Sequence, residues 1–247
     1  MPSAVPLVRN PITTPTPTGG TSPGGAAGGT RGTSGPDSLR GTAGADLIFG
    51  LGGPDSIFGL GGNDSVYGGD GDDSLVGDAD NDILFGGAGR DSVLGGVGDD
   101  TSYGGKGSDS VSGDEGNDLL FGNQDADTLL GGAGNDTLFG GAGDDSLFGG
   151  IGDDCLSGDR GRDTLTGGAG NDTFAIGRLA DGDVITDFTD GTDRIRLNAG
   201  LTFGELTISA GAGTTTSTII QLTSTKETLA TLFGVAPSSI TQADFIF

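Results

Sequence analysis

The apolar positions of this chain recur every nine residues over more than half of its length. Residues 32–175 divide without a gap into sixteen nonamers, of which GGAGNDTLF at 131–139 is typical. Position eight is apolar in fifteen of them, Ser102 being the exception, and position six is aspartate in all sixteen. Position one is always glycine, and position four is glycine in fourteen. Such a period predicts a solenoid in which each unit stacks on the next.

Within each nonamer, the pattern predicts six residues of turn followed by three of strand. Glycine at positions one and four permits positive φ, and Asp80 and Asp125 suit position four because aspartate tolerates that region. Side chains alternate along a strand, so positions six and eight share one side and positions seven and nine the other. If position eight points inward, the aspartate at position six does too.

Two nonamers make one coil of 18 residues, so odd and even nonamers are expected to stack into two parallel sheets. Eight coils spaced by ~4.8 Å would form a rod about 35–40 Å long. Stacking brings the aspartates of nonamers n and n+2 together, and at ~5 Å and an effective dielectric of ~20 each pair repels by roughly 3 kcal/mol. A hard cation that accepts several oxygen ligands removes this repulsion, and calcium fits.

The nonamers resemble those of the RTX family, the glycine-rich nonapeptide repeats of secreted bacterial proteins. The tail is similar as well, because DGDVITDFTDGTDRIRL (181–197) and ETLATLFGV (227–235) look like segments that follow such arrays. The resemblance implies an all-β parallel β-roll. It also implies calcium between successive turns, bound by two aspartates and by carbonyls of the glycine-rich loops.

The candidate calcium ligands are therefore of two kinds. The side-chain ligands are the sixth-position aspartates, namely Asp37, Asp46, Asp55, Asp64, Asp73, Asp82, Asp91, Asp100, Asp109, Asp118, Asp127, Asp136, Asp145, Asp154, Asp163 and Asp172. The carbonyl ligands implied by the resemblance are those of loop glycines such as Gly68, Gly86, Gly95, Gly104, Gly131, Gly140, Gly149 and Gly167. Eight turns on each of two sides leave seven gaps a side, hence at most about fourteen calcium ions. Fourteen ions would bring +28 against −22 for the array, which has 27 acids and five bases.

One buried aliphatic side chain per nonamer is too little to offset the ordering of nine residues, many of them glycine. We therefore expect the metal-free chain to be unfolded and the calcium-bound chain to be a folded rod. Aspartate is also an ordinary turn former and a component of disordered acidic chains, but neither alternative requires all sixteen in phase. The first four nonamers depart from the repeat pattern at position two, where they have Thr33, Thr42, Leu51 and Leu60. We expect weaker or empty calcium sites in these four nonamers.

The outward positions differ between the two predicted sheets. Even nonamers carry a row of aromatic residues at position nine, namely Phe49, Tyr67, Phe85, Tyr103, Phe121 and Phe139. Odd nonamers carry Ser or Thr at every seventh position, which is most simply a solvated face. The aromatic row either stacks between neighbouring strands or forms a docking surface for a partner or for self-association. Cys155, also at an outward position, is expected to be an incidental exposed thiol.

Composition and charge exclude several classes of function. The 247 residues include 35 acids and 11 bases, a net charge of −24, which excludes a nucleic-acid binder that relies on phosphate neutralisation. There is no His or Trp, and Cys155 is the single cysteine, so intrachain disulfides and zinc sites built on His or Cys are excluded. No apolar run approaches 18 residues, so no membrane span is expected. We also expect no enzyme, because the sequence offers no His base and no nucleophile motif.

Three parts are expected along the chain. Residues 1–31 hold six of the nine prolines and read as a flexible segment. Residues 32–175 form the β-roll. Residues 176–247 form a β-rich cap with strands at 183–188, 193–197, 205–209 and 218–222. The resemblance implies that this tail carries an uncleaved signal for the type I secretion machinery, and no N-terminal signal peptide is visible.

We interpret the chain as a secreted, extracellular calcium-binding repeat protein with a structural or interaction role at the cell surface or in the matrix. The alternative is a secretion and folding module that serves a separate or lost enzymatic partner of the protease or lipase type.

Overall fold

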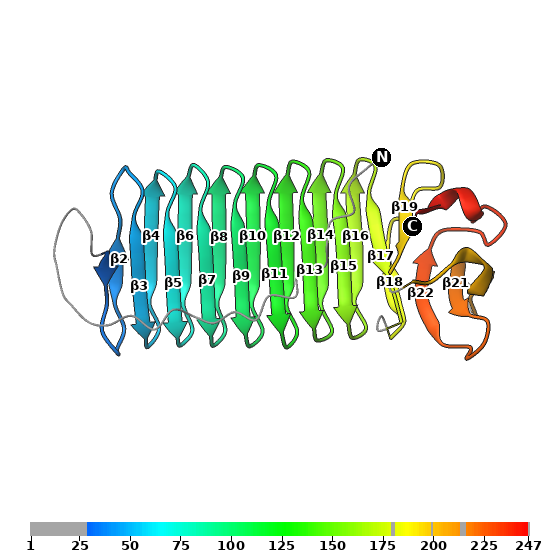
Figure 1. The fold of residues 1–247 in the computed structure, drawn as a ribbon, viewed down its shortest axis with the longest axis horizontal. Coiled ribbons are helices and arrows are strands. Elements are labelled where there is room, and N and C mark those ends of the chain that lie inside the picture. The colour runs from blue at the N-terminus through cyan, green and yellow to red at the C-terminus, as the bar shows by residue number, and fades with distance from the viewer. Residues whose placement is uncertain (1–28, 179–180, 199, 213–215, 247) are drawn as a thin grey trace.

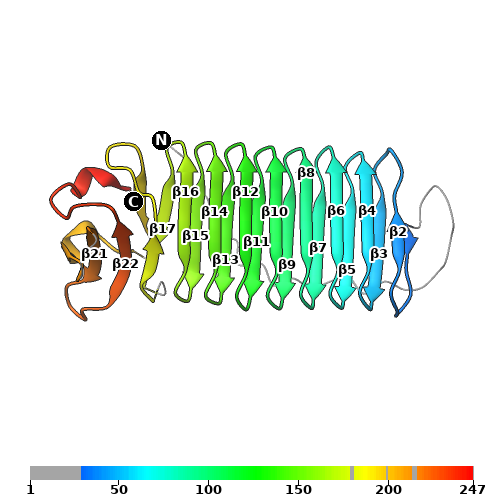
Figure 2. The ribbon, with the colours of Figure 1, turned by 180° about the vertical axis from the view of Figure 1, so that it is seen from behind.

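The chain forms an all-β rod in which coils of two strands follow one another, with a small C-terminal cap at one end (Figure 1; seen from behind in Figure 2). This computed structural model describes residues 29–178, 181–198, 200–212 and 216–246. In the repeat array, paired strands are parallel and lie eighteen residues apart, as with Ser65 beside Ile83. Two nonamers therefore make one coil, and the expected parallel β-roll is confirmed.

Each coil contributes one strand to each of two sheets. Sheet A has the order β1 (Thr30–Arg31), β3 (Leu47–Gly52), β5 (Ser65–Asp70), β7 (Ile83–Ala88), β9 (Thr101–Lys106), β11 (Leu119–Gln124), β13 (Thr137–Ala142), β15 (Cys155–Arg160), β17 (Thr173–Ile176), β19 (Arg194–Leu197) and β23 (Phe245–Ile246). Sheet B has the order β2 (Ser38–Arg40), β4 (Ser56–Gly61), β6 (Ser74–Ala79), β8 (Ser92–Val97), β10 (Ser110–Glu115), β12 (Thr128–Ala133), β14 (Ser146–Ile151), β16 (Thr164–Ala169), β18 (Asp183–Ile185), β22 (Thr228–Phe233), β21 (Ser217–Leu222) and β20 (Leu206–Ala210).

The strands are longer than the three residues predicted. From β3 to β16, each strand covers positions seven to nine of one nonamer and positions one to three of the next, as in the SVYGGD of β5. Backbone pairing even reaches position four, where the Gly71 N–H donates to the Ala88 carbonyl at 2.7 Å. Glycine at position one places no side chain between neighbouring coils, so the ladder runs on through it. Pairing continues at position two even where the residue is not glycine, as with Leu60 beside Asp78.

Position eight forms the core of the roll. Its side chains from Ile48 to Phe174 are at most 1% exposed, and each stacks on the equivalent residue of the next coil. Ser102 is buried in the same row, and its hydroxyl has no hydrogen-bond partner. The row is therefore apolar apart from this one position.

Glycine is needed in the turn for two reasons, and the sequence prediction of positive φ at position one is wrong. Positive φ occurs at positions two and four, as at Gly69 (118°) and Gly71 (127°). At position one the constraint is space. A Cβ on Gly68 would contact the Asp73 carboxylate and lie 2.5 Å from the Gly86 carbonyl oxygen. Position one is thus glycine because two oxygens occupy the place of a side chain.

At the N-terminal end, Thr30 and Arg31 form β1 and pair with Ile48 and Phe49 of β3. The sequence analysis had placed these two residues in the flexible segment, and they belong instead to sheet A. Residues 1–28 of that segment lie outside the described residues.

The C-terminal cap continues both sheets. Strand β18 pairs in parallel with β16 and β22, after which β21 and β20 add antiparallel strands, while β19 and β23 extend sheet A. Two short 3₁₀ turns, η1 (Phe203–Glu205) and η2 (Gln242–Asp244), complete it. The apolar core runs unbroken from the roll into the cap. Among the described residues, no helix is long and apolar enough to cross a membrane.

Three of the four strands predicted in the tail match β19, β20 and β21 to within one residue. The fourth, predicted at 183–188, ends at Ile185. It stops because the Asp187 carboxylate turns back and accepts hydrogen bonds from the N–H groups of Gly167 (3.0 Å) and Gly168 (2.8 Å). The sequence analysis did not identify β22 or β23 as strands.

Candidate metal centres

The sixth-position aspartates stack into two ladders, one along each edge where the chain turns between the sheets. In each ladder the backbone N–H of one aspartate donates to the Oδ1 of the aspartate in the next coil. Asp55 donates to Asp73, and Asp73 donates to Asp91, both at 2.8 Å. The inward orientation predicted from strand alternation is therefore correct, because from Asp55 to Asp172 these residues are at most 4% exposed.

Fourteen inner rungs of the ladders have a second carboxylate oxygen that is buried without a hydrogen-bond partner. These buried Oδ2 atoms belong to Asp55, Asp64, Asp73, Asp82, Asp91, Asp100, Asp109, Asp118, Asp127, Asp136, Asp145, Asp154, Asp163 and Asp183. A buried anionic oxygen without a partner is costly. The roll repeats that cost from coil to coil, so the ladder is chemically suited to a ligand of positive charge.

Backbone carbonyls lie beside these open oxygens. A Cβ placed on Gly113 would contact Asp118 Oδ2 and come within 2.7 Å of the Gly131 carbonyl oxygen, which belongs to the next coil. Each of the eight glycine carbonyls that the sequence predicted as ligands lies next to a ladder aspartate in the same way. Further carbonyls do so as well, among them those of Gly77, Gly113, Gly122 and Gly158. The space beside each position-one glycine is thus lined by a carboxylate oxygen and a carbonyl oxygen.

Within the described part of the chain, no three Asp, Glu, Cys or His side chains come together in a way that could hold a metal ion. A cation between two coils would take two carboxylates from the ladder and draw its other ligands from the backbone. Calcium binds such mixtures of carboxylate and carbonyl oxygen. The residues present therefore fit a hard divalent cation.

Burial raises the pKa of the ladder aspartates from Asp55 to Asp172 above the usual value near 4. The pKa of Asp127 rises to about 8 and those of Asp145 and Asp154 to about 7. Desolvation is the largest cause, and neighbouring carboxylates add to it, whereas the backbone N–H bond to Oδ1 lowers the pKa. Without a cation, the roll therefore holds these carboxyls partly protonated near neutral pH.

The ladders are closed at their N-terminal ends. Asp37 Oδ2 accepts hydrogen bonds from the Thr33 N–H (2.6 Å) and the Thr33 hydroxyl (2.9 Å), and Asp46 is bonded in the same way by Thr42. Asp55 and Asp64, in the third and fourth nonamers, keep Oδ2 open. Weaker or empty sites were expected in the first four nonamers, but the change in geometry falls after the second.

Two aspartates that the sequence analysis did not assign as ligands extend the ladders into the cap. The Asp163 N–H donates to Asp183 Oδ1 at 3.1 Å, and the Asp172 N–H donates to Asp193 Oδ1 at 3.0 Å. The signal was present in the sequence, because Asp183 and Asp193 each stand two residues before a buried isoleucine, as position six stands before position eight.

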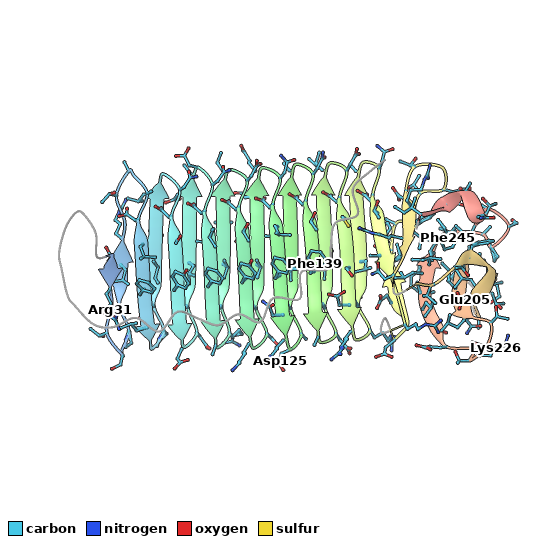
Figure 3. The ribbon with its side chains drawn as sticks, viewed as in Figure 1. Arg31, Asp125, Phe139, Glu205, Lys226 and Phe245 are labelled. Atoms are coloured by element: carbon cyan, nitrogen blue, oxygen red, sulfur yellow. The ribbon has the colours of Figure 1, made fainter. Side chains whose placement is uncertain are left out.

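The aromatic row on sheet A is a continuous stack. Ring centroids from Phe49 to Phe139 are 4.7–5.2 Å apart and ring planes differ by 3–17°, and Figure 3 shows this row of rings with Phe139 labelled. The stacking interpretation is confirmed. Because each ring face is covered by its neighbour, only ring edges remain to meet a partner, and the docking interpretation stays a prediction.

Sheet B is less polar than the sequence analysis suggested. Position nine of the odd nonamers carries an apolar row that includes Phe58 (38% exposed), Leu130 (39%) and Phe148 (40%). The Ser and Thr residues at position seven run beside this row. Both faces of the roll thus present an apolar row at position nine.

Cys155 is less accessible than an incidental surface thiol. Its side chain is half-buried, and the Arg196 guanidinium of β19 donates a hydrogen bond to its sulfur. Burial raises the pKa of the thiol, which opposes the lowering by Arg196. The expectation of an exposed thiol was wrong because the cap brings Arg196 over it.

Stacked coils with paired inward aspartates and converging carbonyls define a calcium-binding β-solenoid. The sequence profile of the RTX calcium-binding nonapeptide repeat (four copies) matches residues 31–66, 58–93, 67–102, 94–129, 103–138, 121–154 and 149–181. These matches cover more than half of the chain. The chain therefore belongs to this family, and it is a calcium-binding repeat protein.

No curated protein matches the sequence. Among solved structures, the chain is similar to the extracellular lipase LipA from Serratia marcescens, with 18% identity over 87% of this chain and a TM-score of 0.36. It is also similar to the AlgE6R3 subunit of the mannuronan C5-epimerase of Azotobacter vinelandii, with 19% identity over 90% of this chain and 86% of that one, and a TM-score of 0.28. The chain spans 40% of the length of the lipase.

Proposed function

We propose that this chain is a secreted repeat protein that folds when it meets extracellular calcium and then serves as a rigid structural or interaction element at the cell surface or in the matrix. One observation supports this above the others. Fourteen buried aspartate oxygens in the described residues have no partner, and those of the inner coils lie beside backbone carbonyls.

In this proposal, the sixth-position aspartates of nonamers n and n+2 hold each ion, together with carbonyls such as those of Gly86 and Gly131. The calcium supplies positive charge and extra ligand positions. The chain supplies two carboxylates at each gap and a glycine at position one that leaves room for the ion. Counting gaps along both edges gives at most about fourteen ions. Asp37 and Asp46, already bonded by threonines, would end the ladders instead of filling them.

The cap fits a role in export. Type I secretion would carry an unfolded chain, and calcium would fold it outside the cell, where such modules bind with Kd ~10⁻⁴–10⁻³ M. In the folded cap, Phe245 is 5% exposed and Asp244 is 4% exposed. A segment of this tail that the secretion machinery recognises would therefore be accessible before folding and buried afterwards. We assign the residues before β1 to a linker, the chain from Thr30 to Ala175 to the roll and residues 176–247 to the cap and secretion signal, and we assign no catalytic residue.

A calcium titration followed by far-UV circular dichroism and sedimentation tests this proposal. The chain in excess chelator is expected to be unfolded and expanded, and millimolar calcium is expected to produce a cooperative β-signal and a compact rod. Equimolar magnesium serves as control, because it demands stricter octahedral geometry. A compact chain with a native β-signal in chelator would overturn the proposal.

A further inference from the structure

The aspartate ladder of one edge continues past the end of the repeats. Asp183 follows Asp163 by twenty residues, not eighteen, and yet it occupies the next rung. Its Oδ1 accepts the Asp163 N–H at 3.1 Å, and β18 stacks on β16 with Ile185 beside Leu165. Asp183 also lies beyond residue 181, where the match to the nonapeptide repeat ends.

Three acids in the tail bond to the last coils, and they differ in what they leave open. Asp187 is satisfied, because each of its oxygens accepts a backbone N–H. Asp193 Oδ2 accepts the Thr189 N–H of its own turn at 2.7 Å, as Asp37 does with Thr33. Asp183 Oδ2 has no hydrogen-bond partner, and neither has Asp163 Oδ2 opposite it. Both side chains are 0% exposed.

The charged side chains that act most on this pair are acidic. The groups that act on Asp163 and Asp183 besides each other are Asp144, Asp159 and Asp181. The ion pairs found in the described residues, Arg90–Asp72 and Arg178–Glu205, involve neither. Two buried carboxyls thus face each other with no cationic side chain to balance them.

We infer that Asp163 and Asp183 bind one further calcium ion between β16 and β18, outside the nonapeptide array, and that this ion fastens the cap to the roll. Strand β18 lies between β16 and β22 in sheet B, so it is the link through which the cap strands continue that sheet (Figure 1). A cation here offsets the repulsion at that link. The inference rests on the proposed calcium binding of the whole roll.

The test compares D183N with D193N in the full chain. Asparagine preserves size and one acceptor oxygen, so each variant can keep its hydrogen bond to the preceding coil. D193N loses only the Thr189 N–H bond within its own turn. Equilibrium dialysis counts bound calcium, and hydrogen exchange reports on residues 228–233 of β22. D183N is expected to bind one ion fewer and to exchange faster in β22 at calcium concentrations that keep the array folded. D193N is expected to match the wild type in both.

An unchanged ion count and unchanged β22 protection in D183N would overturn the inference, and would mean that the two carboxyls share a proton instead. That result leaves the proposed function intact if the wild-type chain still needs calcium to fold. Anomalous diffraction from calcium-grown wild-type crystals decides the matter even if D183N fails to fold. A peak between Asp163 and Asp183 supports the site, and array peaks without it exclude the site.

Discussion

At the scale of single residues, glycine at position one carries a prediction. A Cβ on Gly131 would contact Asp136 Oδ2 and the Gly149 carbonyl, whereas a Cβ on Gly61 would meet nothing within 4 Å. Neither glycine has positive φ, so the two substitutions differ only in the space available. We expect Gly131→Ala to lose roughly 1–3 kcal/mol of stability, as overpacking does, and to weaken calcium binding. Gly61→Ala should change stability by less than about 0.5 kcal/mol.

Urea unfolding in saturating calcium, together with calcium titration, measures both quantities. Equal losses of stability in the two alanine variants would contradict the oxygen-lined space at position one. A general cost of replacing a strand glycine by alanine would then explain both losses.

The raised pKa values of the ladder predict competition between protons and calcium. The pKa of Asp127 is raised to about 8 and that of Asp91 to about 7, against 3.8 unfolded. The metal-free fold thus binds more protons than the unfolded chain. The stability that these carboxyls contribute to the metal-free fold is fully present below about pH 4 and is lost as the pH rises through 7 and 8. In the folded roll, protons and calcium therefore compete for the same oxygens. The metal-free chain is expected to be unfolded and ionised near neutral pH, so the calcium midpoint should change little between pH 8 and 6 and should rise only at lower pH, where protonation stabilises the metal-free roll.

Calcium titrations at pH 8, 7 and 6 followed by circular dichroism check this. In excess chelator, the same chain should gain β-signal on acidification, not lose it. An affinity that falls about tenfold or more between pH 8 and 6 would mean that the metal-free chain is already folded, with protonated ladder carboxyls.

The residue scale also shows how far sequence reasoning reaches. The sixteen aspartates were identified because phase and alternation determine where a side chain points. The hydrogen bonds that close the ladders at their N-terminal ends were not predicted. The bonds from Thr33 to Asp37 depend on a side-chain conformation that no periodicity encodes. Asp183 was missed because the spacing there changes from eighteen to twenty, although its relation to Ile185 repeats that of position six to position eight.

At the scale of the strand, the aromatic stack on sheet A predicts a stability effect. Replacing Phe85, Tyr103 and Phe121 by Ser removes consecutive rings whose centroids lie 4.7–5.2 Å apart. At about 0.2–1 kcal/mol for each lost contact, we expect the triple variant to lose on the order of 1–4 kcal/mol while keeping its calcium-induced fold. Unfolding in saturating calcium measures the loss. Ser74, Ser92 and Ser110→Ala on sheet B is the matched control, because these exposed residues stack no rings.

Sedimentation of the same triple variant examines the docking interpretation. If wild-type chains associate in calcium and the triple variant does not, the ring edges form the contact. If size is unchanged and only stability falls, the row is a stacking spine of the roll.

Sequence patterns predicted the strands of the roll better than their lengths. Position seven begins each strand as expected, but pairing runs on through glycine because the neighbouring coil, not local propensity, supplies the hydrogen-bond partners. The same reason explains the cap. Strands β22 and β23 carry no repeat signal, and they are strands because β18 and β19 offer open edges to pair with.

At the scale of the whole molecule, the roll is quasi-one-dimensional, so each coil depends mainly on its neighbours. The array carries −22 before any metal binds, and we therefore expect its folding to require cations along the entire length. The cap differs, because its core is built of ordinary apolar side chains such as Leu229 and Leu232. Roll and cap are thus stabilised by different forces within one continuous core.

This difference predicts that a defect at the C-terminal strand stays in the cap. Phe245 is 5% exposed, pairs with Ile195 and packs against Phe203 at a ring distance of 5.1 Å, whereas its neighbour Ile246 is 39% exposed. We expect Phe245→Ser to cost the cap about 3–5 kcal/mol, the range for emptying a buried phenylalanine site, and Ile246→Ser to cost little. Hydrogen exchange at residues 194–197 and 228–233 reports on the cap, and calcium titration reports on the array. The calcium midpoint of the array should move little in either variant, because all but the last coils of the array lie more than two strands from β23. A midpoint that shifts together with cap protection would show that roll and cap fold as one cooperative unit, with the cap acting as the nucleus from which the calcium-bound coils grow.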